Sequence, residues 1–88
     1  MNKYLVEFVG TLLLLYVILV TGNAFAIGAA LAIAIIVGSK TSGGHFNPAV
    51  TITMAAAGKK SLNEVLPYIL SQIAGGLVAL ELYKQMKV

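Results

Sequence analysis

Residues 42–51 read Ser-Gly-Gly-His-Phe-Asn-Pro-Ala-Val-Thr, and they interrupt a sequence that is otherwise strongly apolar. Asn47 is a residue type that caps helix N-termini, and Pro48 suits the first helical position, where a backbone N–H is not needed. Gly43 and Gly44 allow the backbone to turn tightly just before the cap. The stretch therefore predicts a short helix whose N-terminus points at something polar. Inside a membrane, such irregular backbone is tolerated only where it is buried in protein or lines a water-filled cavity, which predicts a pore.

The composition predicts an all-α integral membrane protein. Of the 88 residues, 59% are hydrophobic and only 10% are charged, whereas a soluble domain of this size needs a largely polar exterior. The polar residues sit in short clusters between apolar runs, as expected for helices that cross a bilayer several times. We therefore expect a multi-pass protein of the plasma or inner membrane, surrounded by lipid.

The charged residues exclude several classes of function. The net charge is +3, but the lysines flank the apolar runs and form no patch, so they indicate anchors at the membrane surface and no nucleic-acid partner. The sequence has no activated nucleophile, no paired carboxylates and no His, Cys or carboxylate cluster with metal-ligand spacing. It predicts no enzyme, no cofactor and no bound metal.

Three segments are predicted to span the membrane as helices, namely residues 4–20, 24–38 and 64–83. The first two are joined by a short turn and should be antiparallel neighbours. The third follows Ser61-Leu62-Asn63-Glu64, which matches the capping-box pattern. Ridges of small residues spaced four apart predict close helix packing, one at Ala24, Gly28 and Ala32 and another at Ser71, Gly75 and Ala79.

The short helix, over residues 48–57, cannot cross the bilayer, because an α-helix rises only about 1.5 Å per residue. Gly58 follows as a C-terminal stop, and Lys59 and Lys60 draw that end to the lipid surface. The segment is therefore predicted to enter the membrane to mid-depth and return to the same side.

The chemistry of this loop predicts passive conduction of water and small neutral solutes. The amide N–H₂ of Asn47 lies at a helix N-terminus that carries about half a positive charge, and both attract the oxygen of a passing water. Carbonyls of the non-helical residues 42–45 can accept its hydrogens, because they have no ladder partners. The positive helix end repels cations and protons.

Residues 43–51 resemble the first Asn-Pro-Ala signature of the major intrinsic proteins, the aquaporin and glycerol-facilitator family. Residues 7–11 resemble the first-helix motif of that family, and its third helix is matched by Pro67, Tyr68, Gln72 and Gly75. The resemblance covers essentially all 88 residues. It implies half of an aquaporin-like fold, with three transmembrane helices and one re-entrant half-helix in a single half-repeat over residues 1–88.

The resemblance also implies roles for single residues. Glu7 would accept backbone amides of the loop, although a surface ion pair with Lys3 is an alternative, and Gln72 would also support the loop. Ile27 lies where family members often carry a pore-lining aromatic, so an aliphatic there hints at solutes larger than water, such as glycerol. The residues expected at the pore are Gly43, Gly44, His45, Asn47, Pro48, Ala49 and Ile27.

Family members contain two such repeats in opposite orientations, and this sequence contains one. Three interpretations follow. An inverted second copy completes the pore, which makes the chain a homo-oligomer, or a separately encoded second half completes it. In the third, the chain is a truncated, non-conducting remnant or a small membrane interaction protein.

Overall fold

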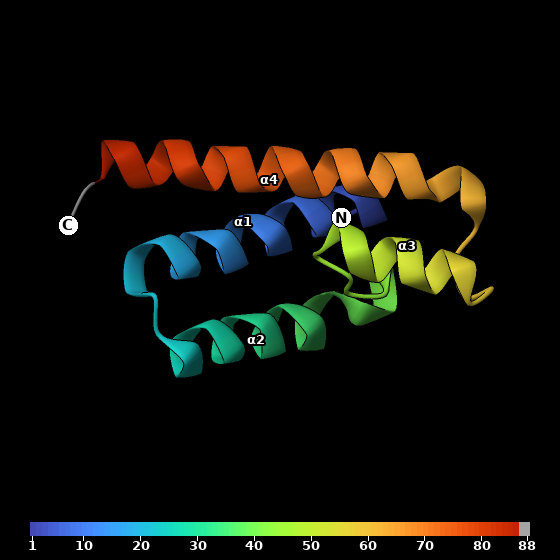
Figure 1. The fold of residues 1–88 in the computed structure, drawn as a ribbon, viewed down its shortest axis with the longest axis horizontal. Helices are drawn as coiled ribbons and strands as arrows, with labels where there is room; N and C mark the ends of the chain where they lie inside the picture. Colours follow the sequence, from blue (N-terminus) through green and yellow to red (C-terminus); the bar gives the residue numbers. More distant parts are fainter. Residues whose placement is uncertain (87–88) are drawn as a thin grey trace.

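The computed structural model describes residues 1–86 and consists of helices joined by short connections (Figure 1). In chain order these are α1 (Lys3–Thr21), α2 (Ala24–Ser42), α3 (Pro48–Ala56), the single 3₁₀ turn η1 (Leu62–Glu64) and α4 (Val65–Gln85). Three helical segments, Lys3–Thr21, Ala24–Ser42 and Leu62–Gln85, are long and apolar enough to cross a membrane. The predicted all-α membrane fold is confirmed.

Local sequence signals set the ends of the first two helices. The side chains of Asn2 and Asn23 cap α1 and α2, where their Oδ1 atoms accept hydrogen bonds from Leu5 N and Ala26 N, each at 2.9 Å. Gly22 ends α1 in the left-handed conformation, with φ of 55°, which a glycine adopts without steric strain. This Gly-Asn pair turns the chain back, so that α2 runs antiparallel to α1.

Helix α1 lies at the centre and packs against both α2 and α4 (Figure 1). Its contact with α4 is close enough to exclude a side chain at Gly75, because a Cβ there would lie 2.4 Å from the carbonyl oxygen of Phe8. Ala79, one turn further along α4, is fully buried. The small-residue ridge predicted on α4 is therefore packed at these two residues.

The ridge predicted on α2 is wrong as a packing surface within the chain. Ala24, Gly28 and Ala32 are exposed, and nothing lies within 4 Å of a Cβ built at Gly28. The residues that α2 buries are displaced from them and keep the same spacing of four, namely Ala30, Ala34, Gly38 and Ser42. Because α2 is rich in alanine and glycine, several of its faces satisfy the small-residue pattern, and only the position of α1 selects one.

The predicted capping box before α4 is also wrong. Ser61 makes no side-chain capping bond, and its hydroxyl instead contacts the side chain of Asn63. The carboxylate of Glu64 pairs with the ammonium groups of Lys3 and Lys60. These two lysines attract the carboxylate that the capping box needs, and the chain enters α4 through the 3₁₀ turn η1.

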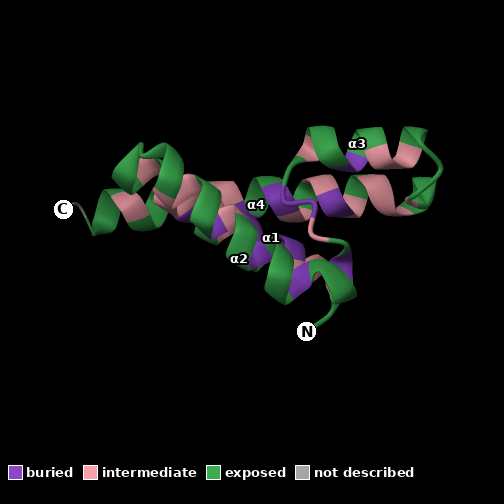
Figure 2. Cartoon of the chain, turned by 90° about the horizontal axis from the view of Figure 1, so that it is seen from below, coloured by how far each residue is buried: buried purple, intermediate pink, exposed green. Residues whose placement is uncertain are grey.

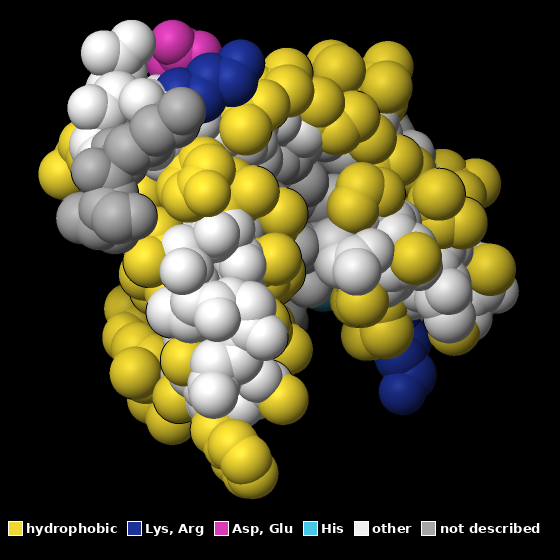
Figure 3. All heavy atoms as spheres, turned by 60° about the vertical axis from the view of Figure 1, so that its left-hand side comes forward, with side chains coloured by type: hydrophobic (Ala, Val, Ile, Leu, Met, Phe, Trp, Pro, Cys, Tyr) yellow, Lys and Arg dark blue, Asp and Glu magenta, His cyan; other side chains and the backbone are white. Residues whose placement is uncertain are grey.

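Burial is concentrated where α1, α4 and the loop before α3 meet (Figure 2). The largest fully buried side chains are Tyr68, Phe46, Gln72, Glu7 and Thr51, three of them polar or charged. Hydrophobic side chains cover much of the outer surface (Figure 3). The interior is therefore a polar cluster at the base of the loop, and most of the apolar surface faces outward.

Candidate pore site

The loop between α2 and α3 consists of residues 43–47 and has an unusual backbone. Gly43 and Gly44 have φ of 89° and 66°, and Phe46, which carries a side chain, has φ of 55°. This left-handed region is uncommon for a non-glycine residue, and such strain persists only where surrounding contacts hold it. The contacts that hold this loop come from all the long helices.

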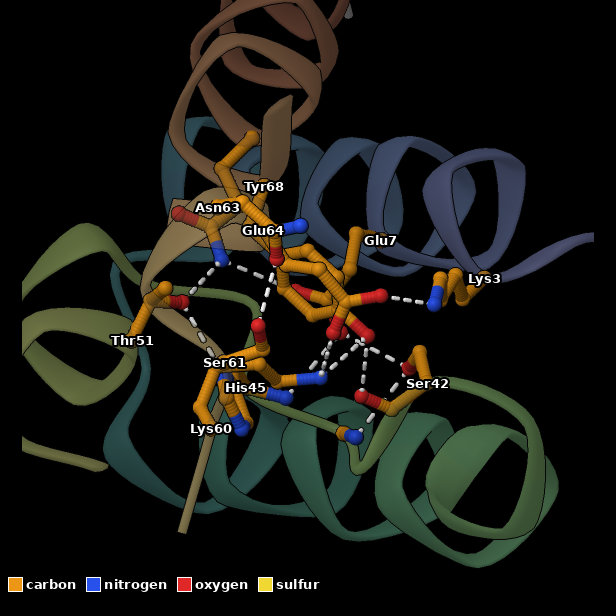
Figure 4. A network of polar contacts seen from close by, with 12 residues as sticks. Lys3, Glu7, Ser42, His45, Thr51, Lys60, Ser61, Asn63, Glu64 and Tyr68 are labelled. Carbon is orange, nitrogen blue, oxygen red and sulfur yellow. Dashed lines mark hydrogen bonds and ion pairs between the residues drawn. The ribbon is translucent and has the colours of Figure 1, made fainter. Parts of the chain in front are cut away.

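Glu7 on α1 supplies the central contact. Its Oε1 accepts hydrogen bonds from Phe46 N at 2.8 Å and Gln72 Nε2 at 2.9 Å, and its Oε2 from His45 N at 3.1 Å and Ser42 Oγ at 2.7 Å (Figure 4). The carboxylate is fully buried. The alternative of a surface ion pair with Lys3 is wrong, because Lys3 pairs with Glu64.

Gln72 on α4 and Thr51 on α3 extend this network. The Nε2 of Gln72 donates to Thr51 Oγ1 at 2.9 Å as well as to Glu7. Thr51 Oγ1 also lies 2.9 Å from His45 Nδ1, within hydrogen-bonding distance. Among the described residues, Gln72 Oε1 and Thr11 Oγ1 are buried without a hydrogen-bond partner. The network therefore fixes α3 to α4 directly behind the loop.

The His45 ring lies behind the loop, against the ring of Tyr68, with the ring centroids 5.3 Å apart. His45 is outside the spanning helices, and burial lowers the pKa of its ring, an effect that nearby Glu7 opposes and Lys60 reinforces. The ring is therefore mainly neutral at neutral pH. With the ring turned inward, the backbone is the part of His45 left to face the open side of the loop.

Phe46 fills a notch between α1 and α2, a role that the sequence analysis missed. Its ring occupies the space where a side chain at Gly10 would lie, 2.1 Å from a Cβ built there, and it lies 3.2 Å from the Cβ position of Gly38. Phe46 is only 2% exposed. The sequence signal that could have indicated this role was a glycine on each of the two helices, Gly10 and Gly38, together with one aromatic residue in the loop, Phe46.

The loop leaves a row of polar groups free. Among the described residues, the carbonyl oxygens of Gly43, Gly44, His45 and Phe46 accept no hydrogen bond. The carbonyl of Ser42 is different from what was expected, because it accepts a hydrogen bond from the Tyr68 hydroxyl at 2.7 Å. The unpaired acceptors therefore begin at Gly43.

Asn47 caps α3 and lies at the end of this row. Its Oδ1 accepts a hydrogen bond from Ala49 N at 2.7 Å, its side chain is exposed, and its N–H₂ group has no partner among the described residues. Pro48 occupies the first helical position, as the pattern predicted. The capped tip of α3 thus carries a free donor beside the free carbonyls.

An open groove of about 360 Å³ lies beside this tip. The polar residues that line it are Thr11, Asn47 and Gln72, and the other lining residues are apolar, namely Leu14, Leu15, Ile18, Phe46, Pro48, Ile73 and Gly76. Ala49 borders a separate shallow hollow on α3. Ile27 stands apart from both, half-buried in the first turn of α2. Within residues 1–86, no three His, Cys, Asp or Glu side chains gather to hold a metal ion.

The fold and site define a class of protein: a multi-pass membrane protein with a re-entrant half-helix, whose capped tip at Asn47 and Pro48 borders a groove. The sequence pattern of the major intrinsic protein family matches residues 1–88. The chain belongs to this family, and its fold is half of the aquaporin-like fold.

Individual relatives agree with this assignment. A glycerol uptake facilitator protein-like 6 from Lactiplantibacillus plantarum is 41% identical over an alignment that covers 90% of this chain and 41% of the relative. A glycerol uptake facilitator protein from Streptococcus pneumoniae is 36% identical over 89% of this chain and 41% of its own length. An aquaporin Z from Photorhabdus laumondii is 60% identical over 43% of this chain and 16% of its own length. The chain thus spans about 41% of the length of its longer-matching relatives.

Proposed function

We propose that residues 1–88 are one half-repeat of a passive channel for water and small neutral solutes such as glycerol. The observation that carries this proposal is the row of unpaired carbonyls from Gly43 to Phe46, next to the free N–H₂ of Asn47. A membrane protein that leaves such groups unpaired in the bilayer loses several kcal/mol for each, unless water or a solute satisfies them. A file of water or polyol molecules supplies both the donors and the acceptors.

The geometry also supports exclusion of charge. A water or hydroxyl oxygen accepts a hydrogen bond from Asn47 Nδ2 at the N-terminus of α3, and its hydrogens turn toward the loop carbonyls. The α3 macrodipole places partial positive charge at this point, which opposes cations and protons. Conduction therefore needs no catalytic group, and we propose no enzyme activity.

The proposed residues divide into two sets. The pore set is Gly43, Gly44, His45, Asn47, Pro48, Ala49 and Ile27, and the loop-supporting set is Glu7 and Gln72. For the supporting set, the hydrogen bonds to the loop and to α3 favour the role. For Ile27, the support is the family resemblance alone.

We further propose that a second copy in the opposite orientation completes the pore. The groove beside the Asn47 tip is open, so one copy alone does not enclose a channel there. A twofold arrangement would bring two Asn47 tips together at mid-membrane and turn both grooves toward each other. A separately encoded second half is the alternative partner, and a non-conducting remnant is the other possibility that the experiment must separate.

The test is stopped-flow osmotic swelling of liposomes that contain only this chain, with water and glycerol gradients. Asn47→Leu removes the free donor at the pore, and Gln85→Leu, which also replaces an amide by leucine but at an exposed position in the last turn of α4, is the control. We expect fast permeation with a low activation energy, lost in Asn47→Leu and kept in Gln85→Leu.

Permeation no faster than through bare lipid, from protein shown to be helical and inserted, would sink the inverted dimer. Co-reconstitution with the second half of a relative would then separate the other two cases. Restored permeation indicates a missing partner, and continued inactivity indicates a remnant.

A further inference from the structure

A line of polar contacts connects the membrane surface to the pore loop through Tyr68 on α4. The Tyr68 side chain is fully buried. Its hydroxyl donates to the carbonyl oxygen of Ser42 at 2.7 Å and accepts a hydrogen bond from Lys60 Nζ at 2.8 Å (Figure 4). A buried hydroxyl that both donates and accepts is fully used, so its removal leaves partners on two sides unsatisfied.

Ser42 is the junction on the loop side. It is the last residue of α2, and its hydroxyl donates to Glu7 Oε2 at 2.7 Å and accepts a hydrogen bond from Gly44 N at 3.1 Å. Glu7 in turn holds the amides of His45 and Phe46. Tyr68 therefore fixes the backbone of Ser42, the residue directly before the row of free carbonyls, which begins at Gly43.

Lys60 is the junction on the surface side, in the connection between α3 and η1. Its ammonium lies 4.0 Å from the centroid of the Tyr68 ring and 3.4 Å from Glu64 Oε1, and only 13% of its side chain is exposed. Glu64 also pairs with Lys3 at the start of α1. The ammonium thus ties the end of the re-entrant segment to α4 and, through Glu64, to α1.

We propose that Lys60 and Tyr68 are positioning residues for the pore loop, which transmit the position of the α3–η1 connection at the membrane surface to the carbonyls of residues 43–45. They touch no solute and act through Ser42. A displacement of the connection shifts those carbonyls and changes which solute passes. The transport consequence rests on the proposed channel function, whereas the ordering of the loop does not.

The first test is hydrogen–deuterium exchange of the loop amides, which requires no transport. The contacts from Lys60 through Tyr68 to Ser42 are called the relay below. Tyr68→Phe removes its central hydroxyl. Tyr4→Phe is the matched control, because the Tyr4 ring packs edge-on against Tyr68 at 5.8 Å and its hydroxyl has no hydrogen-bond partner among the described residues. We expect about tenfold faster exchange at Gly44, His45 and Phe46 in Tyr68→Phe and no change in Tyr4→Phe.

Two results would overturn the relay. Unchanged loop exchange in Tyr68→Phe would show that the hydroxyl does not order the loop. Equal acceleration along α1 and α4 would show a general loosening of the bundle.

Variants at Lys60 keep the inference testable if Tyr68→Phe fails to fold. Lys60→Met should accelerate exchange at the same three amides. Lys60→Arg, which retains a donor, should keep exchange as slow as in the unsubstituted chain. Lys59→Met is the control, because the Lys59 side chain is exposed. Loop exchange that is the same in Lys60→Met as in Lys59→Met would contradict the role of Lys60.

Transport provides a readout that stability alone does not change. In Tyr68→Phe the ratio of glycerol to water permeability should shift, whereas a loss of folded protein lowers both permeabilities alike. If loop exchange is faster in Tyr68→Phe but the ratio of glycerol to water permeability is unchanged, the proposed effect of these residues on transport is overturned. If the unsubstituted chain does not conduct, the proposed function fails, and loop exchange alone then decides the relay.

Discussion

At the scale of single residues, the site is organised around one buried carboxylate. Glu7 on α1 accepts four hydrogen bonds, which come from the end of α2, from the loop and from α4. A buried carboxyl group is tolerated only where its oxygens have hydrogen-bond partners in this way. One side chain therefore joins the three spanning helices to a loop that has no secondary structure of its own.

Replacement of this carboxylate by an amide should destabilise the fold. In Glu7→Gln, an N–H₂ group replaces one of the two carboxylate oxygens and cannot accept the hydrogen bonds that this oxygen accepts in the unsubstituted chain. Each buried donor left unpaired costs about 1–3 kcal/mol. We expect unfolding in mixed micelles, followed by circular dichroism, to show a loss of about 3 kcal/mol. Glu81→Gln, at an exposed position on α4, should change stability by less than about 0.5 kcal/mol. Equal stability of the two variants would contradict the role of Glu7.

The sequence made some of these residues predictable and concealed others. Glu7 and Gln72 stand out because a carboxylate or amide within an apolar run needs partners. Phe46 and Thr51 are ordinary residues for a membrane helix. Their places depend on the left-handed backbone at Phe46 and on where α4 lies, and neither is encoded in the local pattern.

At the scale of helices, the decisive contact is the one between α1 and α4. Gly75 lies against the α1 backbone, with its Cβ position 2.4 Å from Phe8 O and 3.1 Å from Leu12 N. Gly76, its neighbour, has only Leu15 Cγ at 3.7 Å, an ordinary contact. Adjacent glycines of one helix thus meet opposite steric conditions.

This difference predicts opposite effects of the same substitution. Gly75→Ala forces two backbones apart and should destabilise the fold by about 1–3 kcal/mol. Gly76→Ala should stabilise it by about 0.5–1 kcal/mol, because glycine in a helix interior is less favourable than alanine. Unfolding midpoints in the same micelles measure both changes. A Gly75→Ala variant as stable as Gly76→Ala would show that α1 and α4 do not pack this closely.

Helices were more predictable than their contacts. Apolar length alone identified the spanning segments, since membrane thickness sets a minimum helix length. The buried face of α2 depends on α1, because alanine and glycine occur on several of its faces. The start of α4 depends on lysines distant in sequence or across a turn, which bind Glu64. Tertiary partners, absent from any local pattern, decided both.

At the scale of the whole molecule, the described residues reverse the arrangement of a soluble domain. The buried polar residues are Glu7, Thr11, Ser42, His45, Thr51 and Gln72. Large hydrophobic side chains such as Phe25, Ile36 and Val37 are 77–88% exposed. The apolar surface thus holds the chain in the bilayer, and the lysines determine its preferred orientation across the membrane.

By their places in the sequence, the six lysines divide four to two between the two ends of the spanning segments, which is a modest bias toward one orientation. Lys3, Lys40, Lys59 and Lys60 lie toward one membrane side and Lys84 toward the other, with Lys87 outside the described residues. Positive charge on the cytoplasmic side normally sets topology. A small bias is compatible with insertion in both orientations, which the inverted dimer requires.

The chain contains no cysteine, so single cysteines report its orientation without background. Asn63→Cys and Gln85→Cys place a thiol at opposite ends of the segment formed by η1 and α4. In intact cells of a bacterial host, a membrane-impermeant maleimide should label comparable fractions of both variants, because each orientation exposes one of the two ends. Full labelling of one variant and none of the other would establish a single orientation. A second copy could then not complete the pore, since two copies inserted the same way cannot bring their Asn47 tips together from opposite sides. A separately encoded second half or a non-conducting remnant would remain.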